Sequence, residues 1–319
     1  MCSSDLNFVS INRWYYAEST RLLAFDFTRP ETPEFLSKID AGSGEAWDLS
    51  DPFASNGVVL FSYKVAGARA HAVETAEEIA ARMGRHFLLR VDYADPAAPV
   101  LDNTEINLPG SLTGVARAGK LLFTVGQNYD VATGTAKKGE SALHVSAFDG
   151  AAAHLLDTLP LASRYEPLSI QGETIFALDG QPAQIWDGST VRGMTDFNDQ
   201  GLPVSFWGGG TWKENPKTSL LSVWRLDDAG KFTKLDEIEA AHDTALHVFG
   251  SLVVTNGDAR ALHLFDASDT TKLEKFGEFH FSGWVYPDLG EAAGGLETGL
   301  WVPLGAYGVE TVAAPAPAR

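Results

Sequence analysis

Charged and aromatic residues gather at four links between predicted strands. They are Trp47, the run Arg164-Tyr165-Glu166, the pair His242-Asp243, and Trp284 with Tyr286. Such residue types can bind a small polar ligand or a peptide where the links converge on one concave surface. In the competing interpretation, each of them solvates a rim or caps a neighbouring hydrophobic layer. The sequence therefore offers candidate ligand-binding residues without assigning a reaction to them.

No pattern typical of a catalytic or metal site occurs in the sequence. There is no Gly-X-Ser-X-Gly turn, no P-loop and no Gly-rich dinucleotide fingerprint. His242 and His247 are five residues apart in a predicted strand, so their side chains are expected on opposite faces. The single cysteine, Cys2, excludes disulfides and thiolate cages. We expect no catalytic residue from a motif, no metal and no cofactor.

Two segments come close to functional motifs and fail at the defining residue. Residues 205–212, Ser-Phe-Trp-Gly-Gly-Gly-Thr-Trp, match the Asp-box of sialidase-type propellers except for its Asp. Residues 196–201 begin like an acidic calcium loop, but Trp207 stands at the twelfth position, where a bidentate Glu is needed. The favoured interpretations are a Gly-rich strand bend and a turn.

A short apolar run that ends in Asp recurs along the chain. The six copies end at Asp26, Asp92, Asp149, Asp187, Asp227 and Asp266. From the third copy onward the intervals are 38, 40 and 39 residues, close to the roughly 40 to 45 residues of a four-stranded propeller blade. Each Asp is expected to accept hydrogen bonds from backbone amides of the turn that follows its strand.

The neighbours of these runs predict antiparallel sheets. An apolar run precedes each copy after a turn, as at 121–125 after Gly119, so the two runs are expected to form a hairpin. The runs are rich in β-branched and aromatic residues with little alternation, which is typical of strands packed on both faces. More polar segments such as 275–281 suit outer strands that face water. The predicted fold class is all-β.

The apolar-Asp endings, including Trp186-Asp187, resemble the Trp-Asp ending of WD40 blades. Residues 89–99, Leu-Arg-Val-Asp-Tyr-Ala-Asp-Pro-Ala-Ala-Pro, followed by 108–110 and 114–116, are similar to the LVIVD-type repeat of bacterial and archaeal secreted or cell-surface β-propeller proteins. This resemblance implies an extracellular scaffold, in most cases without known chemistry.

We therefore predict a β-propeller of four-stranded antiparallel blades at 7–312. Two incomplete blades, 8–40 and 284–312, flank the complete ones, and the natural ring is expected to have seven blades, or alternatively eight. Five complete blades are expected, at 44–108, 111–161, 163–200, 202–240 and 242–282. Two inserts between second and third strands lie at 66–86, with a short helix at 75–84, and at 126–141, expected as a mobile hairpin or loop.

The two ends are expected to lie outside this domain. Residues 1–6, Met-Cys-Ser-Ser-Asp-Leu, are similar to the translation of a sequencing adapter, so they are expected to be non-native and to replace an upstream segment that could hold a signal peptide. The Ala/Pro tail at 313–319 is expected to be disordered.

The composition narrows the classes of partner. With 24 Lys and Arg against 42 Asp and Glu, the formal charge is −18, which opposes nucleic acid and anionic membranes as partners. We expect a non-enzymatic binding or scaffold protein, secreted, periplasmic or on the cell surface, that takes a protein, a peptide or a small polar ligand at the channel mouth. The alternative is a propeller-fold hydrolase or lyase acting on a carbohydrate or lactone, so enzymatic activity stays open.

Overall fold

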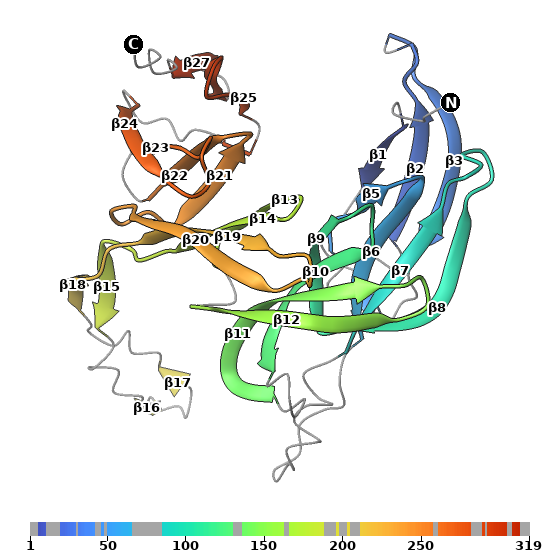
Figure 1. The fold of residues 1–319 in the computed structure, drawn as a ribbon, viewed down its shortest axis with the longest axis horizontal. Coiled ribbons are helices and arrows are strands. Elements are labelled where there is room, and N and C mark those ends of the chain that lie inside the picture. The colour runs from blue at the N-terminus through green and yellow to red at the C-terminus, as the bar shows by residue number, and fades with distance from the viewer. Residues whose placement is uncertain are drawn as a thin grey trace. The chain divides into compact units, whose positions relative to one another are not determined.

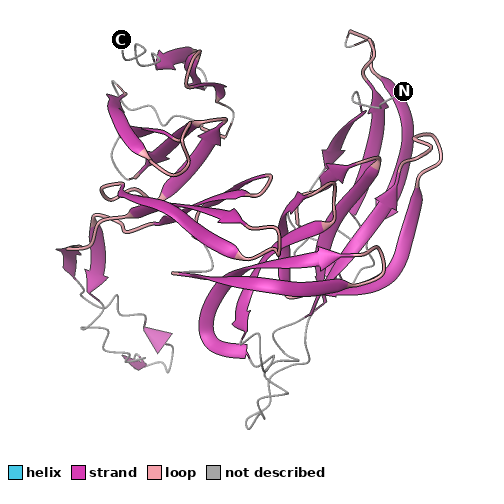
Figure 2. Ribbon diagram, viewed as in Figure 1, coloured by secondary structure: helices cyan, strands magenta, loops and turns pink. Residues whose placement is uncertain are grey.

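The fold is taken from a computed structural model of residues 1–319 (Figure 1). It describes residues 6–10, 20–29, 31–41, 46–47, 50–65, 85–129, 136–162, 166–187, 196–197, 203–204, 211–257, 261–281, 289–290, 292–304 and 308–312. Every regular element in these ranges is a strand, and the sheets are antiparallel (Figure 2). The chain is an all-β protein with four-stranded blades of the β-propeller type.

The described strands fall into two compact units. The first holds 1–165, 170–174 and 225–233, and the second holds 166–169, 175–224 and 234–319. The predicted helix at 75–84, the residues 1–5 and the tail 313–319 lie outside the described residues, while Leu6 begins a strand. No helix that could cross a bilayer occurs in the described part of the chain.

Two sheets open the first unit. Strands β1 (Leu6–Ser10), β2 (Thr20–Asp26) and β3 (Glu34–Ala41) form a three-stranded sheet in chain order. In the next sheet, β4 (Ala46–Trp47) and β5 (Phe53–Ser55) both pair with β6 (Val58–Val65) at different points, so together they act as one interrupted inner strand. Strands β7 (Arg85–Asp92) and β8 (Val100–Leu108) complete this sheet.

The third sheet of the first unit is a four-stranded meander. Its strands are β9 (Gly110–Ala116), β10 (Leu121–Tyr129), β11 (Ala136–Phe148) and β12 (Ala153–Leu161). Because β10 runs to Tyr129 and β11 starts at Ala136, most of the predicted insert 126–141 extends this hairpin. Buried Leu60 and Leu88 of the preceding sheet pack with Leu112 and Leu122 of this one, which joins the two sheets through one hydrophobic layer.

The structure corrects the predicted boundary between blades 163–200 and 202–240. Strands β13 (Leu168–Gln171), β14 (Thr174–Asp179), β19 (Leu220–Leu226) and β20 (Phe232–Glu239) form one four-stranded sheet. The run ending at Asp187 is β15 (Gln184–Asp187), which pairs with β18 (Thr211–Glu214), while β16 (Asp196–Phe197) pairs with β17 (Pro203–Val204). In the described part of the chain, four complete blades replace the five predicted.

The physical reason for this difference is the length and burial of the competing strands. β15 has the same apolar-Asp ending as β19, but it has only four residues, and Ile185 in it is exposed. β19 places fully buried Leu221 and Val223 beside β14. Burial of each such side chain contributes roughly 1.5 to 3 kcal/mol, so the longer apolar strand completes the sheet.

The second unit ends with two further sheets. β21 (Ala245–Phe249), β22 (Leu252–Asn256), β23 (Ala261–Asp266) and β24 (Glu274–His280) form a four-stranded meander at the predicted blade 242–282. β25 (Ala293–Gly295), β26 (Gly299–Pro303) and β27 (Val309–Val312) form a three-stranded sheet. These strands are short, as expected for sheets that pack on both faces.

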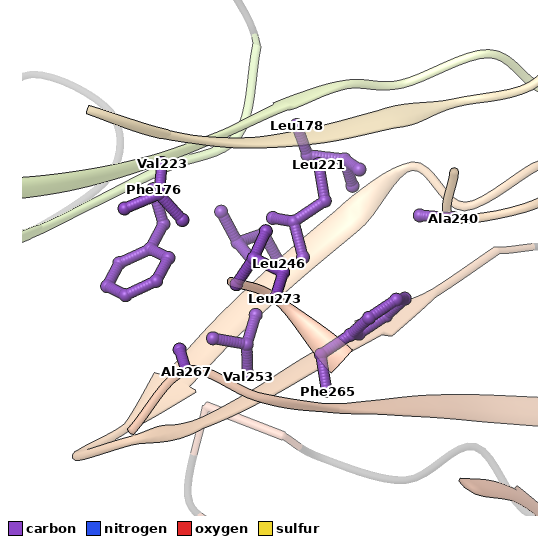
Figure 3. Packing of buried hydrophobic residues seen from close by; sticks show 10 residues of the cluster. All are labelled: Phe176, Leu178, Leu221, Val223, Ala240, Leu246, Val253, Phe265, Ala267 and Leu273. Carbon is purple, nitrogen blue, oxygen red and sulfur yellow. The ribbon is translucent and has the colours of Figure 1, made fainter. Parts of the chain in front are cut away.

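Hydrophobic layers join the sheets of the second unit. Phe176 and Val223 pack with Val253 and Phe265 across neighbouring sheets, in a cluster of ten buried residues (Figure 3). On the other face of the same meander, Leu262 packs with residues of the last sheet. The meander β21–β24 is therefore covered on both faces, and any polar group on it must find a partner inside the protein.

Backbone amides of turns bond to the carboxylates at five of the six repeated Asp positions. The acceptor Oδ1 lies 2.7 to 2.8 Å from the amide nitrogen two or four residues on, in the pairs Asp26 with Thr28, Asp92 with Ala94, Asp149 with Ala151, Asp227 with Lys231 and Asp266 with Ser268. For Asp187 the structure describes only the backbone. Such bonds are typical of Asx turns after a strand.

Candidate functional site

The structure describes only some of the predicted link residues. Arg164, Tyr165, Trp284 and Tyr286 lie outside the described residues. Trp47 is in β4, where only the backbone is described, and half-buried Glu166 precedes β13. His242 and Asp243 are described and lie between β20 and β21. The candidate site therefore contains this last pair.

Asp243 is buried, and both its carboxylate and its carbonyl accept hydrogen bonds. Its side chain is 4% exposed, and its Oδ2 lies 2.6 Å from Nδ1 of His263. The Thr255 hydroxyl donates a second hydrogen bond to the same oxygen. The Asp243 carbonyl accepts a hydrogen bond from the Ser219 hydroxyl at 2.6 Å. Because a carboxylate away from water needs such donors, these contacts explain how Asp243 can be buried.

Strand register brings three of the partners together. Thr255 pairs with His263 across β22 and β23, and His263 pairs with Glu278 across β23 and β24. Directly paired residues of an antiparallel sheet point to the same face, so the three side chains form one polar row. Val253 and Phe265 on that face belong to the hydrophobic cluster of Figure 3, and the polar row thus lies beside this hydrophobic layer.

A chain of alternating acids and imidazoles runs from this row to the surface. Nε2 of His263 lies 3.3 Å from Oε2 of Glu278, and Nε2 of His280 lies 2.8 Å from Oε1 of Glu278. Side-chain exposure rises along it, from 4% for Asp243 and 10% for His263 to 41% for Glu278 and 68% for His280. We name these four residues the Asp243–His280 relay.

Glu278 is held as a carboxylate by its neighbours. Partial burial raises its pKa, but the charges of His263 and Lys275 and the hydrogen bond from His280 lower it by more, and the resulting pKa lies below the ordinary value. Nζ of Lys275 is 3.7 Å from Oε2 of Glu278. Glu278 therefore stays ionised at neutral pH and can only accept hydrogen bonds.

The meander β9–β12 contains a related row without acids. Thr124 pairs with His144, and His144 pairs with Thr158, in the register that Thr255, His263 and Glu278 have in β21–β24. Nε2 of His144 lies 2.8 Å from the Gln127 carbonyl and Nδ1 lies 3.1 Å from the Thr158 hydroxyl. Burial lowers the pKa of His144 and outweighs the carbonyl contact, so this ring is neutral.

The two meanders share the Thr-His row but differ in the groups around it. A buried Thr-His row occurs in both meanders, so the row itself is a packing feature of the repeat. Only in β21–β24 do Asp243 and Glu278 flank the imidazole, and only there does a second imidazole, His280, extend the row to the surface, among the described residues. The added acids and His280 are the part that packing does not require.

Two polar atoms without a hydrogen-bond partner among the described residues lie near the link that carries Asp243. Nδ1 of His242 and Oδ1 of Asn256 are buried and have no hydrogen-bond partner among the described residues. Their segments adjoin, because the His242 carbonyl would lie 2.5 Å from a Cβ placed on Gly257. Ala241, just before His242, has a φ of 49°, which is unusual for a residue with a side chain. Such orphan groups and strained residues are found together at functional sites.

The network also extends toward the sheet that holds β14 and β19. The Ser219 hydroxyl, which bonds to the Asp243 carbonyl, accepts a hydrogen bond from the Gln181 amide at 2.8 Å. Nε2 of Gln181 donates to Asp179 at 2.8 Å. The link that carries Asp243 is thus fixed by side chains of the neighbouring sheet, which holds the buried end of the relay in place.

No metal centre was found in the described ranges: they hold no group of three or more His, Cys, Asp and Glu side chains placed to bind a metal ion. The relay has a different chemistry. An exposed imidazole oriented by a carboxylate is the arrangement of a general base and its positioning group.

Three relay residues, His263, Glu278 and His280, were not among the predicted site residues. They lie inside strands, and only the register of β22, β23 and β24 aligns them. One signal could have found His263, since Thr124 and Thr255 each stand five residues after the Gly of their hairpin and each faces a His. Superposing the repeats would have exposed this pair.

No protein-family model matches the chain, and no curated protein does. A protein described as a 6-phosphogluconolactonase from Bacteroides uniformis is 12% identical with a TM-score of 0.42, covering 87% of this chain and 83% of that one. The periplasmic gluconolactonase of Pseudomonas aeruginosa is 14% identical with a TM-score of 0.39, covering 97% and 100%. A hypothetical selenium-binding protein from Sulfolobus tokodaii is 11% identical with a TM-score of 0.44, covering 83% and 58%.

These findings correct the expectation of a non-enzymatic binding or scaffold protein. Two of the similar structures are described as lactonases. The candidate site itself holds linked ionisable groups, Asp243, His263, Glu278 and His280.

Proposed function

We propose that the chain is a hydrolase that adds water to the carbonyl carbon of a lactone, with His280 as general base. The observation that carries this proposal is the relay, in which an exposed imidazole contacts a carboxylate at 2.8 Å and a buried Asp-His pair supports that carboxylate. A general base and an acidic group that orients it are parts of known acyl-transfer sites, and here a buried Asp-His pair holds the acidic group.

The reaction follows from the hydrogen-bond roles. The base form of the His280 imidazole carries one proton, which lies on Nε2 because the Glu278 carboxylate only accepts, so Nδ1 is free for a proton of water. The water oxygen forms a bond to the lactone carbonyl carbon as His280 takes that proton. His280 then returns the proton to the ring oxygen as the carbon–oxygen bond breaks. Lactone and water give one hydroxy acid, so the atoms balance.

The state of Glu278 favours a lactone over a glycoside as substrate. Glycosidases use a carboxylic acid that stays protonated to donate to the leaving oxygen. The pKa of Glu278 lies below its ordinary value, because the charges of His263 and Lys275 and the contact with His280 outweigh partial burial, so Glu278 cannot serve as this acid at neutral pH. Base-catalysed attack on an activated carbonyl needs no such acid.

One further group lies close to the buried end of the relay. The unsatisfied Nδ1 of His242, in the link that carries Asp243, is a candidate to bind a hydroxyl of a polar substrate. Asn256 pairs with Leu262, so its side chain lies on the sheet face opposite to His263 and His280 and has no part in the proposal. Asp243, predicted to bind a ligand directly, acts in this proposal as a positioning residue.

We also infer an extracytoplasmic location, in line with the LVIVD-type resemblance at 89–99. The support is this resemblance, whose Asp residues have their turn roles in the structure: Asp92 and Asp95 each accept a hydrogen bond from the amide two residues on, at 2.8 and 3.0 Å. Fractionation of cells that express the complete coding region tests this; protein confined to the cytosol would contradict it.

The activity is tested by steady-state kinetics on glucono-1,5-lactone and a neutral aryl ester, above the buffer rate. His280→Gln is expected to lower kcat about 100-fold or more with little change in KM, since general-base catalysis contributes 10²- to 10⁴-fold. His154→Gln is the matched control, because His154 is an exposed imidazole 3.4 Å from Asp149 without a buried support. Equal loss in both variants, or no wild-type hydrolysis of either substrate, would refute the proposal.

A further inference from the structure

A pocket of about 470 Å³ lies in the first unit, between turns of the two sheets that Leu60 and Leu122 join. Three turns line it, at 55–56, 118–120 and 149–150. Val58, Leu60 and Phe148 add apolar surface, and Arg90 adds a guanidinium. This size and mixture are typical of small-molecule sites.

Residues with positive φ shape the turns that line the pocket. Asn56 has a φ of 50°, which an Asn-Gly hairpin turn favours, whereas Ala118 has a φ of 57°, in the left-handed region that alanine rarely adopts. Arg117, at 49°, anchors the second turn through Nε and Nη2, which lie 2.9 and 3.0 Å from the Glu173 carboxylate. Strain that the surroundings hold in place is a mark of functional sites.

Of the two cations that line the pocket, Lys120 is the one without a partner in the described ranges. Asp149 accepts hydrogen bonds from the amides of Ala151 and Ala152, both at 2.8 Å, so its carboxylate is occupied. Nη2 of Arg90 contacts Asp102 at 2.9 Å, while Nη1 faces the turn, 3.9 Å from a Cβ placed on Gly150. Among the described residues, the Lys120 amine has no hydrogen-bond or ion-pair partner.

We propose that this pocket binds a small organic monocarboxylate. Since Arg90 is paired with Asp102 and Asp149 accepts two backbone amides, the Lys120 amine is the charge of the lining without a partner in the described part of the chain, and one carboxylate neutralises it while a phosphate dianion over-compensates it. Val58, Leu60 and Phe148 give the organic body an apolar surface. The pocket shares no residue with the Asp243–His280 relay, so the two proposals stand or fall separately.

The test is calorimetric titration with phenylacetate, its neutral analogue 2-phenylethanol and the dianion phenyl phosphate. Phenylacetate is expected to bind saturably and at least about tenfold more tightly than either of the others, since a charge-assisted hydrogen bond is worth this factor or more. Lys120→Glu is expected to weaken phenylacetate about tenfold or more. Lys217→Glu makes the same charge change at an exposed lysine outside the pocket and is expected to leave binding unchanged.

Three results would overturn the carboxylate site. They are no saturable binding of phenylacetate, equal or tighter binding of one of the other two probes, and wild-type affinity in a folded Lys120→Glu. Should Lys120→Glu fail to fold by circular dichroism, Lys120→Met replaces it, since it removes the charge and keeps the apolar stem. Unaltered binding in that variant overturns the proposal equally.

Discussion

His263 Nδ1 lies 2.6 Å from Asp243 Oδ2 in the interior of the second unit, although the two residues are 20 positions apart in sequence. The contact joins the link before β21 to the middle of β23, and Thr255 closes it from β22. An imidazole and a carboxylate are stable in the interior as a pair, because either group alone would lack its main hydrogen-bond partner.

Removing Asp243 should therefore cost stability. Asp243→Ala leaves the imidazole of His263 and the hydroxyl of Thr255 without their acceptor, and we expect the free energy of unfolding to fall by about 3 kcal/mol. Urea titration monitored by fluorescence measures it. Asp51→Ala, an exposed carboxylate in the described region, should change it by less than about 0.5 kcal/mol. A similarly small change in Asp243→Ala would contradict the burial argument.

The turn role of the repeated Asp residues can be tested at Asp266. Its Oδ1 accepts the Ser268 amide at 2.7 Å, so Asp266→Ala should lower Tm through a loss of roughly 1 kcal/mol. Asp266→Asn keeps an acceptor and is expected to retain most of the stability. Calorimetry distinguishes the two variants, and lactone hydrolysis should be unaffected in both. A lost activity at unchanged Tm would point to a functional role instead.

A pH dependence of stability follows from His144. Burial lowers its pKa in the folded protein, so below about pH 6.5 the unfolded chain binds a proton that the folded chain does not. The free energy of unfolding should then fall as the pH drops from 6.5. His144→Gln should lose this part of the slope and His154→Gln should retain it, as measured by urea titrations between pH 5 and 8. An unchanged slope in His144→Gln would exclude the mechanism.

A close backbone approach explains two paired glycines. Gly110 and Gly126 face each other in β9 and β10, and a Cβ on Gly126 would lie 2.4 Å from the Pro109 carbonyl oxygen. Gly126→Ala should destabilise the protein by roughly 2 kcal/mol, because backbone atoms cannot move aside cheaply. Gly277→Ala, whose Cβ would meet only Leu264 at 3.6 Å, is the control and should stay within about 0.5 kcal/mol. Equal thermal midpoints would show that the strands can separate there.

Much of the fold could be predicted from local pattern. Apolar runs that end in Asp mark third strands correctly in β7, β11 and β23, because the strand and its turn are both encoded locally. The pattern failed at β15, where the same ending occurs in a four-residue strand. Which of two similar segments pairs with β14 depends on how much apolar surface each buries. That burial depends on contacts between segments far apart in the sequence.

The candidate site was predictable only in part. His242 and Asp243 stand out as polar residues in a link, where local reasoning applies. His263, Glu278 and His280 lie on two strands whose alignment with Thr255 depends on register, and a shift of one residue would turn each side chain to the other face. A bulge between Leu264 and Phe265 interrupts the pairing of β23 with β24, so the partner of His263 on β24 cannot be found by counting residues from the turn.

The most direct test of the central claim is kcat for glucono-1,5-lactone in Glu278→Gln. Glutamine keeps the size of the side chain and removes the charge that orients His280, so kcat should fall by about 100-fold while KM and Tm stay near the wild-type values. A folded Glu278→Gln protein that hydrolyses the lactone at the wild-type rate would contradict the assignment of the relay as the catalytic site.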